Sequence, residues 1–169
     1  AATRVLKWWR EKLKDPVKLL EVQAEDEHPR VRLEALNAAS WIRSLASAGA
    51  ALRALKHPRD PMIDYVLKET MSTLDPLWKE ALRQGDVAWA PAHPLVAEYL
   101  LASVGSGELV RMPRTAAVRM AILTRPGVAL DARREALKEL AKEKNADETS
   151  VLLDLLEASP SAEDLGRLL

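Results

Sequence analysis

Ten prolines and six glycines divide this 169-residue chain into segments about as long as one short helix. Proline in the first turn of a helix loses no hydrogen bond and already has a suitable φ, so it commonly marks a helix start. The segments between are rich in Leu, Ala, Glu, Lys and Arg, which are the best helix formers. Phenylalanine is absent and aromatic residues make up only 4% of the chain. These features predict an all-α protein built from short helices.

The punctuation and the apolar spacing together locate the expected helices. We expect them over residues 3–13, 16–26, 29–43, 48–56, 61–74, 76–84, 94–104, 107–112, 114–124, 131–145, 147–158 and 161–169. The 29–43 segment is apolar on two sides, with one stripe of Val31, Ala35, Ala38 and Ile42 and another of Leu33 and Leu36. A helix buried on two sides is typical of a stack in which each layer packs against its neighbours.

Two hexapeptides suggest an internal repeat. Residues 31–36 align with residues 118–123, because both begin with Val-Arg and end on Leu five places after the Val. The stretch Asp-x-His-Pro-Arg-Val-Arg at 26–32, followed by an Ala-rich helix, resembles the opening of a HEAT repeat. We therefore predict a single domain over residues 1–169, a HEAT-like α-solenoid of short antiparallel helix pairs.

A broader resemblance covers most of the chain. It rests on Arg-Val-Leu-Lys-Trp-Trp-Arg at 4–10, the 26–35 stretch, Ala-Leu-Lys-His-Pro-Arg-Asp at 54–60, residues 64–71 and 74–78, Ala-Ile-Leu-Thr-Arg-Pro-Gly at 121–127 and residues 162–169. Together these resemble the HEAT-repeat region of large, multidomain haem-binding proteins of planctomycete-type bacteria. Those proteins resemble membrane-bound dehydrogenases, with a β-propeller before the repeats and a c-type cytochrome module after them.

The resemblance implies a scaffold between redox modules of one longer polypeptide, in a periplasmic or other extracytoplasmic location. It also implies that a haem c module could be the partner of this segment. The Cys-x-x-Cys-His sequence that attaches haem is absent from these residues, so no cofactor is assigned to any of them.

Charge and cysteine content exclude several function classes. Basic and acidic residues both number 25, whereas a general nucleic-acid binder usually has a basic excess. Without cysteine there are no disulfides, thiolate metal sites or cysteine nucleophiles. No apolar run approaches the roughly 18 to 20 residues that span a bilayer.

All three histidines, His28, His57 and His93, stand directly before a proline. If equivalent turns line one edge of the solenoid, the three imidazoles could bind a metal ion. The favoured interpretation is structural, because a residue before proline adopts extended backbone at a turn. No His-x-x-x-His or Glu-x-x-His pair supplies local chelation, so we assign no metal site.

No constellation of catalytic residues is recognisable in the sequence. Acid–base chemistry needs a carboxylate or histidine in a cleft that shifts its pKa. We expect Asp15, Asp131, Asp147 and Glu163 to lie at helix caps or on solvent faces instead. Gly-x-Ser-x-Gly and a Gly-rich phosphate loop are both absent. We therefore predict a protein that is not itself an enzyme, although a parent polypeptide could be one.

Residues 109–130 contain arginines but no acidic residue before the chain reaches Asp131. The four arginines are Arg111, Arg114, Arg119 and Arg125. One interpretation is a face for an anionic partner, such as nucleic acid cradled by a helical repeat. The alternative, which the lack of interleaved aromatic residues favours, is a solvated face with some guanidinium groups satisfying carbonyls at helix C-termini.

Tryptophans supply the other candidate contacts. Trp89 lies in a predicted loop, where it could either anchor a partner or pack over a helix end. Trp78 is a second candidate contact residue, whereas we expect Trp41 in the core or at a repeat junction. Trp8 and Trp9 point about 100° apart on a helix, so one narrow stripe cannot bury both. An alternative is that these two side chains cover a preceding repeat of a longer chain.

The expected function is therefore that of a non-catalytic helical scaffold that binds a protein partner or flanking domains of its own polypeptide. The partner-binding candidates are Trp78, Trp89, Arg111, Arg114, Arg119 and Arg125. Two alternatives remain open: a nucleic-acid-binding helical repeat that uses the Arg111–Arg125 face, and an accessory of a redox enzyme that contacts a haem module electrostatically.

Overall fold

The structure, a computed structural model, describes residues 2–158, and these are helical without any strand. The elements are α1 (Ala2–Trp9), η1 (Arg10–Lys12), α2 (Pro16–Ala24), α3 (Pro29–Trp41), α4 (Leu45–Leu52), η2 (Arg53–Lys56), α5 (Pro61–Thr73), α6 (Asp75–Arg83), α7 (Pro94–Ala102), α8 (Ser106–Leu109), α9 (Ala116–Thr124), α10 (Leu130–Lys144) and α11 (Glu148–Ala158). The expected all-α class is confirmed. The helix predicted over 161–169 lies outside the described residues. Within residues 2–158, none of the helices combines the length and the hydropathy needed to cross a bilayer.

Proline punctuation marks the helix starts as expected. Pro16, Pro29 and Pro61 each occupy the first turn of their helix. Asp15 caps α2 by accepting a hydrogen bond from the backbone N–H of Lys18, at 3.0 Å. This arrangement satisfies N–H groups that have no partner inside a helix. The sequence therefore predicts these boundaries to within one or two residues.

The start of α4 lies three residues earlier than predicted. The expected helix over 48–56 is in fact α4 followed by the 3₁₀ turn η2. Ser44 and Ser47 form a capping box, in which each hydroxyl accepts a hydrogen bond from the other residue's backbone N–H. Ser at the N-cap with Ser three residues later is less recognisable than the usual Ser/Thr and Glu/Gln pair. This explains why the boundary is missed.

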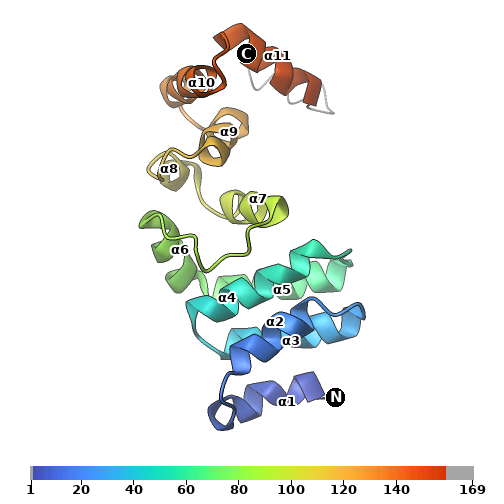
Figure 1. The fold of residues 1–169 in the computed structure, drawn as a ribbon. Helices are drawn as coiled ribbons and strands as arrows, with labels where there is room; N and C mark the ends of the chain where they lie inside the picture. The colour runs from blue at the N-terminus through green and yellow to red at the C-terminus, as the bar shows by residue number, and fades with distance from the viewer. Residues whose placement is uncertain (1, 159–169) are drawn as a thin grey trace. The chain divides into compact units, whose positions relative to one another are not determined.

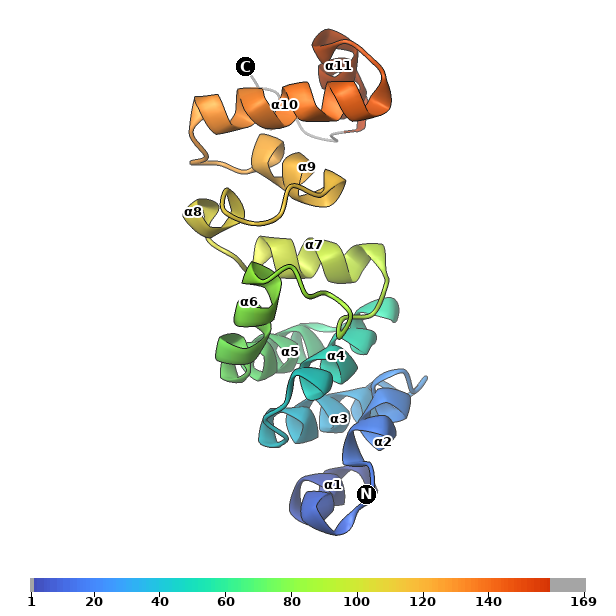
Figure 2. The ribbon, with the colours of Figure 1, turned by 60° about the vertical axis from the view of Figure 1, so that its left-hand side comes forward.

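The chain packs as two compact units, Ala1–Ala97 and Glu98–Leu169. In the first unit α3 lies between α1 and α5, while α2 packs against both α3 and α4 (Figure 1). The helices α1, α3 and α5 thus form one layer, and α2 and α4 form a second. Among the described residues of the second unit, α10 packs against both α9 and α11, and α8 contacts α9 (Figure 2).

In the core of the first unit both predicted stripes of α3 are buried in the middle of the helix, whereas Val31, Leu33 and Ile42 are half-buried. Ala35, Leu36, Ala38 and Ala39 are each at most 1% exposed. One stripe along α5 is also buried, since Ile63, Leu67, Thr70 and Leu74 are at most 2% exposed. The Thr70 hydroxyl donates a hydrogen bond to the Leu36 carbonyl at 3.0 Å, so the one polar member of the stripe is satisfied.

A buried arginine joins two turns of the first unit. Arg32 on α3 is 4% exposed, and its Nη1 donates to the carbonyls of Asp26 and Glu27, both at 2.8 Å. Its Nη2 donates to the Pro58 carbonyl at 2.7 Å. One guanidinium therefore connects the turn before α3 to the turn before α5, which follow one another in the same layer. The fork geometry of arginine suits this role, because its donors are spread over three nitrogens in a fixed plane, whereas a lysine ammonium donates from a single nitrogen.

Candidate partner-binding surfaces

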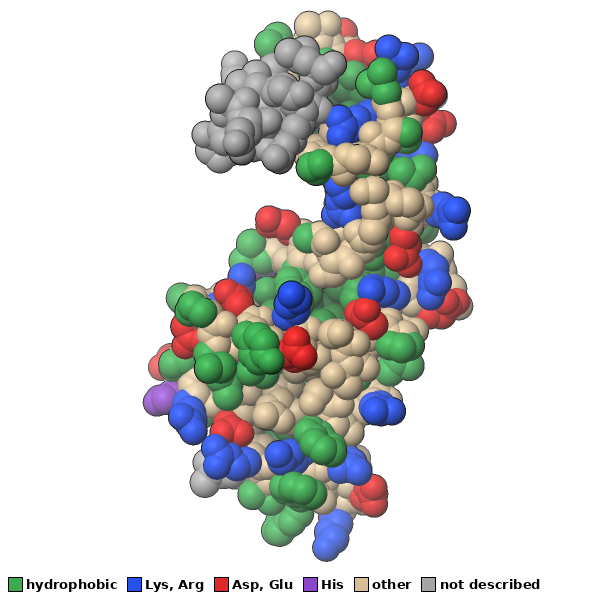
Figure 3. Space-filling view, turned by 180° about the vertical axis from the view of Figure 1, so that it is seen from behind, with side chains coloured by type: hydrophobic (Ala, Val, Ile, Leu, Met, Phe, Trp, Pro, Cys, Tyr) green, Lys and Arg blue, Asp and Glu red, His purple; other side chains and the backbone are tan. Residues whose placement is uncertain are grey.

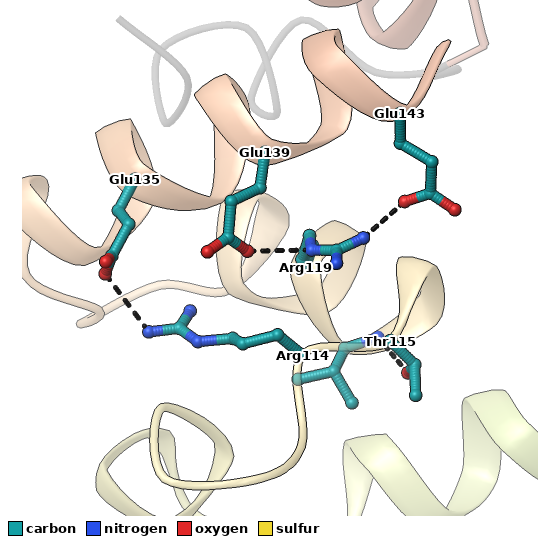
Figure 4. A network of polar contacts seen from close by, with 7 residues as sticks. Arg114, Thr115, Arg119, Glu135, Glu139 and Glu143 are labelled. Atoms are coloured by element: carbon teal, nitrogen blue, oxygen red, sulfur yellow. Dashed lines mark hydrogen bonds and ion pairs between the residues drawn. The ribbon is translucent and has the colours of Figure 1, made fainter.

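The arginines of α9 and the preceding turn are paired with the glutamates of α10. Arg119 forms ion pairs with Glu139, at 2.8 Å, and with Glu143. Arg114 contacts Glu135 at 3.3 Å. The three glutamates are four residues apart, so they lie along one side of α10 and face α9 (Figure 4). These two arginines and three glutamates together therefore carry no excess of positive charge.

The remaining arginines of this stretch lie apart from that network. Arg125 donates hydrogen bonds to the carbonyls of Leu101 and Val104, where α7 ends. The expectation that some guanidinium groups satisfy C-terminal carbonyls is thus confirmed for Arg125. Arg111 is exposed in the turn that follows α8. The structure consequently does not bring the four arginines together as one basic face.

Arg114 also lines a shallow hollow at the start of α10. The hollow is lined by Val110, Arg114, Ala129, Asp131, Ala132, Arg134, Glu135 and Lys138. Its charges are mixed, and Arg134 lies 3.9 Å from Asp131. Mixed charges of this kind are typical of a solvated surface rather than of a site for one anion.

The two tryptophans chosen as contact candidates occupy different environments. Trp78 is 1% exposed, and its Nε1–H donates to the Met71 carbonyl at 2.9 Å. Its ring is a core element of the first unit, so the choice of Trp78 as a contact residue is wrong. The spacing of Trp78, Ala81 and Leu82, all buried on α6, is a signal that could have predicted this.

Trp89 is half-buried in the loop between α6 and α7. Its Nε1–H donates to the Asp86 carbonyl at 3.0 Å, and Asp86 accepts from the backbone N–H of Ala88 at 3.0 Å. The backbone of Trp89 lies directly against Gly49 on α4, because a Cβ added at Gly49 would be only 2.2 Å from the Trp89 carbonyl oxygen. Of the two interpretations, packing over a helix describes Trp89 better than a protruding anchor.

Trp41 is 53% exposed, so it does not lie in the core, one of the two places expected for it. The helix α3 ends at Trp41, so the ring extends beyond the buried stripe. It pairs instead with Trp8 of α1, with ring centroids 6.3 Å apart and planes tilted by 30°. The Lys7 Nζ lies 5.4 Å from the Trp8 centroid and 5.6 Å from the Trp41 centroid. We call Trp8, Trp41 and Lys7 the indole–lysine cluster.

The neighbourhood of this cluster is apolar and basic. Trp8 is 69% exposed, Trp9 55% and Val5 38%, so α1 presents a continuous apolar stripe to solvent. Large hydrophobic side chains and basic side chains lie together on the surface at the α1 end of the first unit (Figure 3). An exposed apolar patch that contains tryptophan and is bordered by arginine is typical of a protein-contact surface.

Glu34 on α3 interacts electrostatically with Lys7 of the indole–lysine cluster. It accepts hydrogen bonds from Arg4, including one from Nε at 3.1 Å. Those bonds, followed by the charges of Arg4, Arg30 and Lys7, hold the pKa of Glu34 below its usual value against partial burial. The carboxylate is therefore ionised at neutral pH and already bonded to Arg4.

The histidines serve as turn residues. His28 caps α3, with its Nδ1 accepting a hydrogen bond from the Arg30 backbone N–H at 3.1 Å. His93 accepts likewise from the Leu95 N–H at 3.3 Å, and His57 ends the η2 turn. Among residues 2–158 no group of three His, Asp or Glu side chains is close enough to hold a metal ion.

The carboxylates named as caps or solvent groups occupy such positions where they are described. Asp147 accepts hydrogen bonds from the backbone N–H groups of Thr149 and Ser150 at the start of α11, both at 2.9 Å. The hydrogen bonds from Ser150 are the main reason why the pKa of Asp147 is lowered. The Asp131 side chain is 99% exposed. Glu163 lies outside the described residues.

Comparisons with protein-family models, with curated proteins and with solved structures found no match for this chain.

Proposed function

We propose that this chain is a non-catalytic helical scaffold whose helices form a HEAT-like α-solenoid of short antiparallel pairs, and that it binds a protein partner. Support for the repeat comes from the first unit, where alternate helices share a layer and Arg32 ties successive turns together. A rigid two-layer frame can present surface side chains at fixed separation.

One observation carries the binding role: the first unit buries its small and aliphatic residues tightly yet exposes three of its tryptophans. Trp8, Trp9 and Trp41 are each more than half exposed, whereas Trp78 is fully buried. Tryptophan is strongly enriched at the energetic centres of protein interfaces, and exposing it in water is otherwise unfavourable. Partner binding gives these side chains a function that stability of the isolated chain does not.

The nucleic-acid alternative is weaker than the sequence suggested. Binding a phosphate backbone needs cations that are not already neutralised. Arg114 and Arg119 pair with glutamates of α10, and Arg125 is engaged with backbone carbonyls. We therefore propose protein, not nucleic acid, as the ligand class.

The resemblance to haem-associated repeat regions defines the setting of this proposal. In that setting the scaffold links a propeller or dehydrogenase-like module to a c-type cytochrome module in a bacterial periplasm. The complete reading frame is the direct check, since a Cys-x-x-Cys-His sequence in the same polypeptide would supply the haem module. A reading frame without any redox module would remove this setting while leaving protein binding in place.

Binding can be tested by affinity capture from the source cells, with quantitative mass spectrometry as the readout. Three chains are compared: the natural one, a Trp8→Ala/Trp9→Ala/Trp41→Ala variant and a Tyr65→Ala control, since Tyr65 on α5 is 61% exposed and distant in sequence. We expect one protein captured in stoichiometric amount by the natural chain and the control, and lost with the triple variant. Capture that is equal for all three chains, or capture of nucleic acid, would contradict the proposal.

A further inference from the structure

The stripe on α1 has the spacing of a helix-docking face. Val5, Trp8 and Trp9 stand at positions i, i+3 and i+4, which places them on one side of the helix. Thr3, on the other side of α1, is 7% exposed and donates a hydrogen bond to Gln23 of α2, while Trp8 pairs with Trp41 at the end of α3. The outward side chains form ridges and grooves of the kind that accept the side chains of another helix. The geometry thus suits an amphipathic helix better than an extended strand, because α1 offers no unpaired backbone edge.

Charge around the stripe indicates which amphipathic helix fits. The whole chain is balanced, yet its first 14 residues contain five basic residues and one acidic residue. The acidic one, Glu11, lies 3.5 Å from Arg10. Lys12 and Lys14 are exposed just beyond α1. A ligand that carries carboxylates beside its apolar stripe would meet this local positive charge.

Lys7 makes the charge argument specific to the stripe. Its ammonium lies over both indole rings, and no hydrogen bond or ion pair holds its Nζ within residues 2–158. Glu34, which it influences electrostatically, is already bonded to Arg4. A carboxylate from a docked helix could reach Lys7 at the edge of the aromatic surface, where partial desolvation strengthens the pair.

We infer that the indole–lysine cluster, together with Val5 and Trp9, is a docking site for an amphipathic α-helix whose apolar stripe is flanked by acidic residues. The inference rests on the proposed function and deepens it by stating the chemistry of the partner. The helix α1 spans eight residues, which is about 12 Å of contact at 1.5 Å per residue. So short a site belongs with small, transient interfaces and micromolar affinity.

A membrane surface is the main competitor, since tryptophan and basic residues also collect at bilayer interfaces. The structure favours a helix because Lys7 lies on the ring faces themselves, not on an opposite polar side. Membrane-surface helices instead separate a charged face from an apolar one. A bilayer would have to take the ammonium into its apolar boundary, whereas an acidic helix would neutralise it.

The test uses two synthetic helical peptides of equal length and equal apolar stripe, labelled with fluorescein. One carries glutamate on both flanks of the stripe, the other lysine. Fluorescence anisotropy with the full chain should give at least about tenfold tighter binding of the glutamate peptide, which corresponds to one favourable ion pair retained and one unfavourable pair avoided. Equal binding of both peptides, or no binding of either, would overturn the inference.

Variants locate the site and separate its failure from that of the proposed function. Lys7→Glu should reverse the peptide preference, Trp8→Ala/Trp41→Ala should abolish binding, and Tyr65→Ala should leave it unchanged. Circular dichroism confirms that each variant folds. Sedimentation velocity and flotation with phosphatidylcholine–phosphatidylglycerol vesicles run alongside: self-association or vesicle binding that requires the same tryptophans would assign the face to a second copy or to lipid and overturn the inference. If the cellular partner still depends on the tryptophans but neither peptide binds, the scaffold proposal stands and the acidic-helix proposal falls.

Discussion

Gly49 is the position where a single methyl group should test the packing of the first unit. Glycine inside a helix costs about 1 kcal/mol relative to alanine, so Gly49→Ala would stabilise α4 if helix propensity alone decided the outcome. The structure predicts the opposite sign. A Cβ at Gly49 would lie 2.2 Å from the backbone oxygen of Trp89, whereas ordinary contacts begin at 3.4 Å. The loop or the helix must therefore move by about 1 Å.

That movement is resisted because the clashing atom is backbone, not the end of a flexible side chain. Two hydrogen bonds hold the loop in place. The Trp89 indole N–H donates to the Asp86 carbonyl at 3.0 Å, and the Asp86 backbone N–H donates to the Ala81 carbonyl at 2.9 Å. Overpacking of well-packed sites costs about 1–3 kcal/mol and occasionally more. Because the obstacle is backbone, the upper part of that range applies, about 2–3 kcal/mol. After the propensity gain of about 1 kcal/mol is subtracted, Gly49→Ala should destabilise by about 1–2 kcal/mol, a fall of roughly 0.5–1 M in the urea midpoint at a slope of about 2 kcal/mol per M.

Urea unfolding followed by circular dichroism measures this shift, and Gly107→Ala provides the control. Gly107 lies in α8, and a Cβ there would meet nothing within 4 Å. It should leave the midpoint unchanged or raise it slightly. If the urea midpoint of Gly49→Ala is as high as that of Gly107→Ala, the loop that carries Trp89 does not rest on α4 and the reasoning is refuted.

Three further predictions concern groups that hold the first unit together. Arg32→Lys should cost about 1.5–3 kcal/mol in urea unfolding, because lysine cannot keep all three charge-assisted bonds to backbone carbonyls; an unchanged midpoint would contradict this role. Trp78→Ala should cost about 3–5 kcal/mol through the cavity and the lost indole bond, and a loss below 1 kcal/mol would show that the ring is not core. The pKa of Glu25 is lowered, by its hydrogen bond to Lys56 first and to Arg53 second. Its stabilising contribution is therefore present above its ordinary pKa of 4.5 and is lost as the pH falls through the lowered value. The urea midpoint of Glu25→Gln should accordingly fall less between pH 7 and pH 3 than that of the natural chain, and equal falls would argue against the pairing.

Local signals in the sequence were sufficient for the helices, since their causes are local. Prolines in the first helical turn and aspartate caps act within three or four residues of themselves, and the sequence displays both partners. The end of α10 follows the same logic, because Asn145 takes the left-handed conformation that asparagine tolerates. The HEAT-like solenoid and the single domain over 1–169 stay predictions.

The candidate site was harder to predict because its chemistry depends on pairings between elements distant in the sequence. Arg119 meets Glu139 and Glu143 only after α10 packs on α9, so a stretch of sequence without acidic residues looked basic. Trp78 was assigned to the wrong environment, and the exposure of Trp41 excludes the core, one of the two places expected for it. The periodicity of α6 was sufficient to bury Trp78, but the exposure of Trp41 follows from where α3 ends.

The two positively charged stretches of this chain therefore carry different weight as binding surfaces. Near α9, Arg114 and Arg119 are paired with carboxylates and Arg125 with backbone carbonyls. A ligand would therefore have to displace an existing bond before it formed a new one. At α1 the Lys7 ammonium lies over exposed indole rings, and a ligand carboxylate would add a bond without breaking one. The free energy of binding is the difference between the interactions made in the complex and those that the two separate surfaces already make internally and with water. By that criterion the tryptophan-bearing face of α1, not the arginine-rich stretch, is where the proposed protein partner would gain most.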